Sequence, residues 1–138
     1  VVPSHYRLKR RVQFYETDAA GIVHFSWFYR YMEEAEHALW REVGLSIAPR
    51  EEEEVGFPRV SASFDFHRPL YFEDEFEIDL VVKEITEKTI CYTATVTSGD
   101  NHIATGSLTI ICVRKTLGKP MKAIAIPAGI ADRFEVES

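Results

Sequence analysis

An aspartate stands where the chain is expected to turn from a strand into a helix. Asp18 lies within the short stretch TDAAG, residues 17–21, and an amphipathic segment follows. A carboxylate in this place can attack a carbonyl carbon or act as the base that activates water. The free N–H groups at a helix N-terminus can hold the oxyanion that forms. The pattern fits attack on an acyl group, while an Asx turn or a helix cap is the plainer role for Asp18.

One long helix is expected to follow this turn. Apolar residues recur there with the period of a single buried helix face. Ser26 is the expected N-cap, because its hydroxyl group can accept a free N–H of the first turn. Gly44 is expected just beyond the helix end, and Gly21 would allow backbone or substrate to approach closely. The residues of the apolar face are Phe28, Met32, Ala35, Leu39 and Val43.

Strands are expected before and after this helix. Beyond Pro58 the spacing of apolar residues changes from helical to alternating, as in half-buried strands. Short turns link the strands, so their pairing should be antiparallel, and one helix against one such sheet defines an α+β domain. The expected segments are strands over 8–14, 60–67, 76–83 and 90–97, a largely apolar central strand over 103–114, and a short closing helix over 128–134.

The second face of the sheet argues for an oligomer. One helix covers only one face, and apolar positions such as Val81 and Ile111 are expected on the other. These side chains would need cover from another subunit, and pairing of edge strands would also hide unpaired backbone groups. The sequence therefore predicts a homo-oligomer.

The composition excludes several classes of protein. The chain has 138 residues, 46% of them hydrophobic, which suits one domain over residues 1–138. A net charge of −6 argues against nucleic-acid binding, and no apolar run approaches the ~18 residues of a membrane span. Cys91 and Cys112 are expected to be buried free thiols, and the acidic run at 51–54 a solvated loop. We therefore expect a cytoplasmic protein with no nucleic-acid or membrane partner.

Several of these segments together resemble one enzyme family. The sequence YETDAAGIVHF, followed by a helix, resembles the signature of the hot-dog-fold acyl-CoA thioesterases of the 4-hydroxybenzoyl-CoA thioesterase family. The helix YRYMEEAEHALWREVGL, the segment FDFHRPLYFEDEFEI and the tail MKAIAIPAGI are similar to further segments of that family. The resemblance covers almost the whole chain. It implies the hot-dog fold, a five-stranded antiparallel sheet wrapped around one long α-helix.

The resemblance also implies an activity and two principal site residues. Asp18 would be the catalytic carboxylate, as nucleophile or general base, and the backbone N–H of Phe25 would polarise the thioester carbonyl. The expected reaction is hydrolysis of an acyl-CoA substrate to a free acid and CoA, with no cofactor beyond the CoA of the substrate. A homodimer or homotetramer with a site shared between chains is expected. The identity of the acyl group stays open.

Other candidates near the helix start carry alternatives. His24 stands one residue earlier than the histidine of many relatives, so a structural or pocket-lining role is favoured over proton transfer. Trp27 and Phe28 fit an aromatic acyl pocket, the core or a subunit interface. Glu33 lies on the long helix, where other hot-dog thioesterases place their carboxylate. Because Asp18 is present, Glu33 is expected to support the site or to lie at the surface rather than to be catalytic. The candidate cations for the phosphates of CoA are Lys88, Arg114 and Lys115.

Three other activities remain open on the sequence. A thioesterase acting on acyl groups of a carrier protein would use the same residues. A hot-dog hydratase or dehydratase would need a catalytic histidine, for which only His24 lies nearby. A non-catalytic acyl-CoA binder would keep the fold without turnover. No metal is expected, because the histidines lack the spacing of metal ligands.

Overall fold

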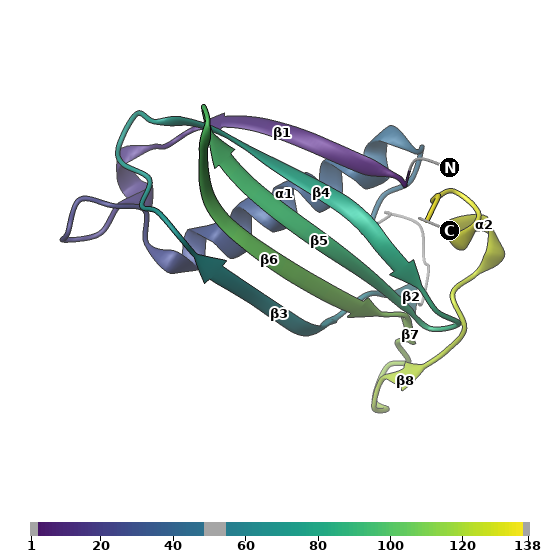
Figure 1. Cartoon of the computed structure of the whole chain (residues 1–138). Helices are drawn as coiled ribbons and strands as arrows, with labels where there is room; N and C mark the ends of the chain where they lie inside the picture. The colour runs from purple at the N-terminus through teal and green to yellow at the C-terminus, as the bar shows by residue number, and fades with distance from the viewer. Residues whose placement is uncertain (1–2, 49–54, 137–138) are drawn as a thin grey trace.

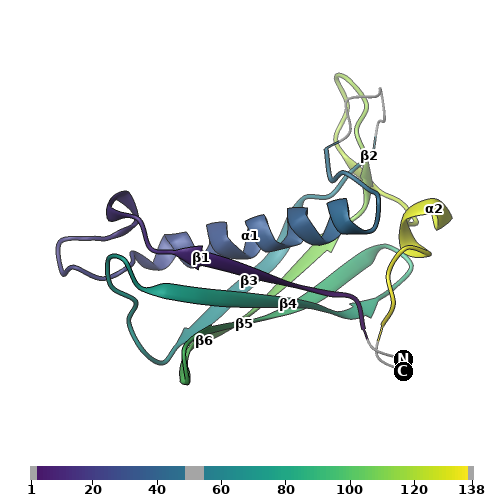
Figure 2. The ribbon, with the colours of Figure 1, turned by 90° about the horizontal axis from the view of Figure 1, so that it is seen from above.

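One long helix, α1 (Phe25–Glu42), lies across a five-stranded antiparallel sheet in the computed structural model, which describes residues 3–48 and 55–136 (Figure 1). The spatial order of the strands is β1-β4-β5-β6-β3. Figure 2 shows the helix on one face of the sheet only, which confirms the expected α+β hot-dog arrangement. The strands are β1 (His5–Arg11), β3 (Arg59–Phe66), β4 (Glu75–Ile85), β5 (Thr89–Ser98) and β6 (Asn101–Ile111).

Helix α1 buries the expected apolar stripe but begins earlier than expected. His24, not Ser26, is the N-cap, because its ring accepts a hydrogen bond from the N–H of Ser26 at 3.3 Å. Gly44 follows the C-cap Val43 with φ of +86°, the left-handed conformation that commonly ends helices, as expected. The stripe residues exposed by 3% or less are Phe28, Met32, Ala35 and Leu39.

Strands β4 and β5 contribute the most regularly buried side chains of the sheet. Alternate residues of both strands are buried, as the sequence pattern predicts, and they are Phe76, Ile78, Leu80 and Val82 on β4 with Ile90, Tyr92, Ala94 and Val96 on β5. Strand β6 is interior, yet β5 rather than β6 holds the central place. Within the described residues, no helix combines the length and apolarity that a bilayer crossing requires.

Several expected boundaries were wrong at the ends of elements. The first strand ends at Arg11, and residues 14–16 form a 3-10 turn, η1 (Phe14–Glu16). The strand expected over 103–114 ends at Ile111, because the chain then joins a separate three-stranded sheet. That sheet consists of β2 (Val55–Gly56), β7 (Val113–Arg114) and β8 (Lys122–Ala123). The closing helix α2 is a single turn, Ala128–Ala131, and the acidic run at 51–54 lies outside the described residues.

Strand β3 differs most from its expected half-buried pattern. Val60 and Phe66 are 57% and 47% exposed, because within the described residues β3 pairs with β6 alone and its other edge is open. Val81 and Ile111 are each half-buried, and the outer sheet face around them is rich in threonine, serine and charged residues. The open edge of β3, with its exposed apolar side chains and unpaired backbone groups, therefore favours a partner chain more strongly than the polar outer face does.

Gly106 of β6 lies directly opposite Phe64 of β3. A Cβ at this glycine would lie 2.6 Å from Phe64 Cε1 and 2.6 Å from the backbone oxygen of Ser63. We expect Gly106→Ala to lower the free energy of unfolding by about 1–3 kcal/mol through overpacking. Urea unfolding is the measurement, and Gly129→Ala, whose Cβ would meet nothing within 4 Å, is the control. Equal stability of the two variants would contradict this account.

Candidate active site

Backbone hydrogen bonds hold the turn that carries Asp18. The N–H of Asp18 donates to the C=O of Ile22, and the N–H of Gly21 donates to the C=O of Asp18, each at 2.9 Å. Gly21 has φ of +82°, and a Cβ there would meet no atom within 4 Å. Glycine thus serves the backbone conformation rather than close approach by other parts of the chain. Asp18 Oδ1 accepts from the N–H of Ala20 at 2.8 Å, so the Asx turn is present, and Oδ2 is left for other partners.

The same turn is fastened to the helix start and to the loop after β3. The N–H of His24 donates to the C=O of Glu16 at 2.9 Å, and the N–H of Val23 donates to the C=O of Leu70 at 2.8 Å. Isolated bridges also join Thr17 with Val23 and Ile22 with Tyr71. These bonds fix the distance between the Asp18 turn and the first residues of α1.

A fully buried carboxylate lies just before the turn. Glu16 is 0% exposed, and its Oε1 accepts from the N–H of Gln13 at 2.8 Å and from the hydroxyl of Tyr31 at 2.9 Å. Arg10 Nη1 donates to Glu16 Oε2 at 2.7 Å, and the guanidinium carbon lies 4.7 Å from the centre of the Tyr31 ring. The sequence pattern gives no sign of this network, because Arg10, Glu16 and Tyr31 come from different elements and meet only in the folded chain.

The pKa values of Tyr31 and Arg10 are both raised in this network. Burial raises the pKa of Tyr31, and its hydrogen bond to the Glu16 carboxylate raises that pKa further. Burial alone would lower the pKa of Arg10, but the hydrogen bond to Glu16 and the charge of Glu34 outweigh it and raise the pKa. Arg10 therefore stays charged and Tyr31 stays neutral over the physiological pH range.

Asp18 lines a pocket of about 510 Å³ at the N-terminal end of α1. Phe25 is the first residue of the helix, so its N–H is one of the amides that lack an intrahelical acceptor. The structure brings Asp18, Phe25 and Phe28 to this one pocket, in agreement with the sequence analysis. The remaining lining residues are Ile22, Val23, Phe66, His67, Arg68, Pro69 and Leu70.

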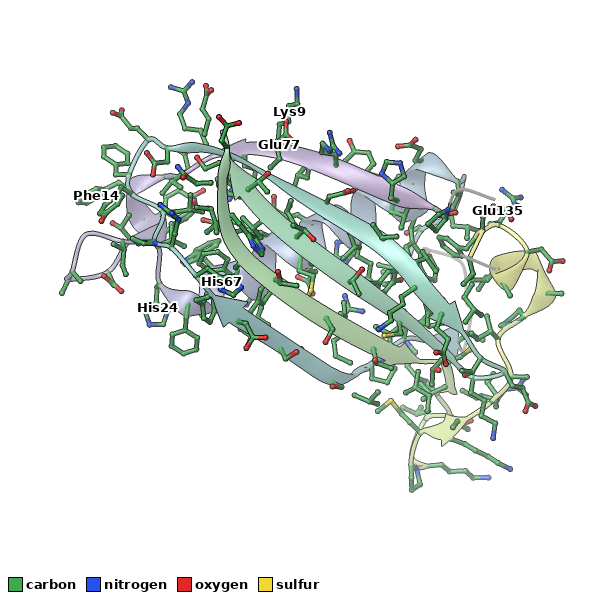
Figure 3. All side chains as sticks on the ribbon, in the orientation of Figure 1. Lys9, Phe14, His24, His67, Glu77 and Glu135 are labelled. Carbon is green, nitrogen blue, oxygen red and sulfur yellow. The ribbon has the colours of Figure 1, made fainter. Side chains whose placement is uncertain are left out.

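The loop after β3 supplies pocket residues that the sequence analysis did not name as site residues. His67 and Arg68 add polar groups to a mostly apolar lining, and Phe66 packs edge-on against Phe28 with ring centres 5.0 Å apart. Figure 3 shows His67 and His24 at the same end of the molecule. The segment FDFHRPLYF contained the signal, since a strand that ends before a proline turn can deliver side chains to a site.

Three residues near the helix start do not line this pocket. His24 is exposed and caps the helix. Trp27 is half-buried against Tyr15 and Tyr31, with ring centres 5.5 and 6.2 Å away, so it belongs to the packing around the buried Glu16 network. Gly21 shapes the turn without lining the pocket.

Glu33 lies away from the pocket and near a second buried carboxylate. It pairs with Arg59 at 3.5 Å and with Arg30 at 3.6 Å, beside a hollow of about 250 Å³. Glu36, 0% exposed, also binds Arg59. Burial raises the pKa of the Glu36 carboxyl group, and the Arg59 charge opposes that rise. These ion pairs join α1 to the start of β3, so the role of Glu33 is to hold the helix against the sheet.

The expected cations lie at the other end of the chain from Asp18. Lys88 is in the turn between β4 and β5, and its C=O accepts from the N–H of Cys112 at 2.8 Å. Arg114 belongs to β7, which Figure 1 shows far from the N-terminal end of α1, and Lys115 follows it. Within one chain, therefore, Lys88, Arg114 and Lys115 do not meet the Asp18 pocket.

A second hollow of similar size, about 540 Å³, lies along β1 and β4. Its charged side chains form ion pairs with one another: Arg11 pairs with Glu75, and Lys9 pairs with Glu77 at 3.7 Å. Figure 3 shows Lys9 and Glu77 side by side. The Asp18 pocket is the better candidate, because it combines an available carboxylate with a helix N-terminus.

Comparison with known proteins identifies the family. Residues 12–134 match the profile of the Thioesterase-like superfamily, and the chain belongs to that superfamily. A protein of Aquifex aeolicus (strain VF5), named provisionally as an esterase, is 31% identical over 131 residues, covering 95% of this chain and 97% of the relative. A 1,4-dihydroxy-2-naphthoyl-CoA hydrolase of Prochlorococcus marinus (strain MIT 9211) is 30% identical over 105 residues, 70% of each chain.

Solved structures show the same fold. A gentisyl-coenzyme A thioesterase superposes with a TM-score of 0.80 at 27% identity, covering 92% of this chain and 98% of that one. A 4-hydroxybenzoyl CoA thioesterase variant in complex with 4-hydroxybenzoyl CoA superposes with a TM-score of 0.82 at 22% identity, covering 94% and 98%. These likenesses confirm the resemblance to hot-dog thioesterases that the sequence motifs indicated.

Removal of Arg10 should expose the dependence of the structure on Glu16. Arg10→Met leaves the buried carboxylate without its cation, and we expect a loss of about 3–5 kcal/mol in the free energy of unfolding. Arg11→Met is the matched control, because Arg11 is 59% exposed and its pair with Glu75 should contribute no more than about 1 kcal/mol. Thermal or urea unfolding of both variants gives the comparison, and similar losses would argue against a special role for Glu16.

Proposed function

We propose that this chain hydrolyses an aromatic acyl-CoA thioester to a free acid and CoA. The observation that carries the proposal is the shared pocket of Asp18 and Phe25, the first residue of α1. The superfamily and the names of relatives that act on 1,4-dihydroxy-2-naphthoyl-CoA and gentisyl-CoA support thioester hydrolysis. Aromatic walls from Phe25, Phe28 and Phe66 favour an aromatic acyl group.

In the proposed reaction Asp18 acts as general base or as nucleophile. As a base, it takes a proton from water while the water oxygen bonds to the thioester carbon. The oxyanion accepts a hydrogen bond from the N–H of Phe25, and the dipole of α1 adds to this stabilisation. Collapse breaks the C–S bond, and the departing thiolate takes up the proton that Asp18 held. As a nucleophile, Asp18 attacks the thioester carbon, breaks the C–S bond and expels CoA as its thiolate, which leaves an anhydride between Asp18 and the acyl group. Water then hydrolyses the anhydride to the free acid and the Asp18 carboxylate, and the proton released from that water goes to the CoA thiolate.

No metal or redox cofactor is needed for either route, because the carboxylate and the helix end supply the base and the oxyanion site. The same residues would also serve a thioester on a carrier protein. A panel of acyl-CoA and acyl-carrier substrates, assayed by release of free thiol, tests the proposal. The highest kcat/KM is expected with an aromatic acyl-CoA.

Asp18→Asn tests the central residue. We expect the folded variant to lose at least ~10²-fold in kcat, as for removal of a positioned acid-base group or nucleophile. Asp74→Asn offers a control carboxylate, since Asp74 Oδ2 accepts from the N–H of Tyr71 outside the pocket. Near wild-type turnover by Asp18→Asn would show that Asp18 is not the catalytic group.

The open edge of β3 supports a dimer with shared sites. Strand β3 runs from Arg59, next to β2 and β7, to Phe66 at the Asp18 pocket. Two copies paired antiparallel through β3 would bring the Arg59 end of one chain beside the Phe66 end of the other. Arg114 and Lys115 of one chain would then approach the pocket of its partner and could bind the phosphates of CoA. This arrangement accounts for cations that lie far from Asp18 within one chain.

A mixing experiment tests the shared site. Asp18→Asn and Arg114→Glu chains are denatured together, refolded and assayed at substrate concentrations below the wild-type KM. In a mixed dimer one site carries both changes and the other carries neither, so mixing should restore up to about a quarter of wild-type activity. Lys83→Glu, an exposed charge reversal on β4, controls for the change of net charge. Absence of recovery despite demonstrated subunit exchange would place each complete site on one chain.

A further inference from the structure

His24 occupies the N-cap of α1, a position that serine, threonine, aspartate and asparagine usually fill. Its Nδ1 atom accepts from the N–H of Ser26 at 3.3 Å and lies 2.8 Å from Ser26 Oγ. Its backbone is also fixed, because its N–H donates to Glu16 and its C=O accepts from Trp27, each at 2.9 Å. His24 thus connects the segment of the buried carboxylate with the first turn of the helix.

We propose that His24 is a positioning residue: as a neutral imidazole it caps α1 and orients the N–H of Phe25 toward the acyl carbonyl, and its protonation withdraws the cap. This inference rests on the proposed role of Phe25. An imidazole that accepts a hydrogen bond at Nδ1 carries its proton on Nε2. Once both nitrogens are protonated, Nδ1–H can donate to Ser26 Oγ but can no longer accept from the N–H of Ser26.

Two further features make the helix start sensitive to this charge. The imidazolium would lie at the positive end of the helix dipole, and the first turn of α1 contains no acidic residue to offset it. The His24 ring also lies against the Phe25 ring, with centres 4.6 Å apart and planes at 33°, and Phe25 lines the pocket. Reorientation of the imidazole therefore affects both a pocket wall and the adjacent amide.

Other charged or titratable groups surround the same region and will contribute to any pH profile. The buried Glu16 carboxylate faces Arg10 and Tyr31 rather than the imidazole. If activity falls at low pH, only the part of that fall that disappears when His24 is replaced can be assigned to His24. The remaining groups near the pocket and the helix start are Asp18, Arg30, His67, with His102 beside it, and Arg68.

The test compares His24→Asn and His24→Ala with the wild type. Asparagine caps helices well and does not titrate, whereas alanine provides no cap. At alkaline pH His24→Asn should retain most of kcat/KM and His24→Ala should lose about fivefold. As the pH is lowered, the kcat/KM of the wild type should fall about fivefold more than that of His24→Asn. His5→Asn is the control, because His5 lies on β1 and pairs with Asp79 at 3.2 Å, away from the pocket.

A measurement without substrate separates this inference from the proposed function. In ¹⁵N NMR spectra, the Ser26 amide resonance of the wild type should follow the titration of the His24 imidazole and should not respond in His24→Asn. An acid limb common to the wild type and His24→Asn, or a Ser26 amide that ignores His24, would overturn the inference. Full activity of Asp18→Asn would instead overturn the proposed mechanism, while the Ser26 titration would still report on the cap.

Discussion

Burial of the Glu16 carboxylate is the constraint on which the position of the candidate site depends. An ionised carboxylate without partners is far more costly to bury than any single hydrogen bond can offset. Glu16 therefore requires Arg10 from β1, the N–H of Gln13 beside η1, and the hydroxyl of Tyr31 from α1 to remain in place. Its backbone C=O also accepts from the N–H of His24. Strand, turn and helix start are thus fixed relative to one another directly before Asp18.

A second buried carboxylate fixes the helix on its other side. Arg59 at the start of β3 binds Glu36, and it also pairs with Glu33. Helix α1 is therefore joined by ion pairs to β1 and to β3, which are the two edge strands of the sheet. Hydrophobic burial holds the helix on the sheet but has little directional preference. The two ion-pair clusters add direction, because charged hydrogen bonds tolerate little displacement.

The two ends of the molecule differ in chemistry. The end that contains the Asp18 turn carries exposed aromatic residues: Phe25 and Phe66 line the pocket, and Phe14 and Phe72 pack edge-on outside it with ring centres 5.6 Å apart. The opposite end carries β7 and β8 with Arg114 and Lys122. The proposed substrate, an aromatic acyl-CoA, combines an aromatic group and phosphates that suit these two kinds of surface. The two surfaces lie at opposite ends of one chain, and the proposed antiparallel pair of chains would place them side by side.

The sequence by itself determined the helix face, the buried sides of β4 and β5, the sheet type and the position of Asp18 at a turn. These follow from local periodicity and turn chemistry, which depend on residues close together in the chain. Only the tertiary structure decided that β3 is an open edge, that His24 caps α1, and that His67 and Arg68 join Asp18 in one pocket. Each of these depends on strand order and on contacts between distant segments. Residue spacing alone does not specify such contacts, because the same alternating pattern suits an interior strand and an edge strand equally well.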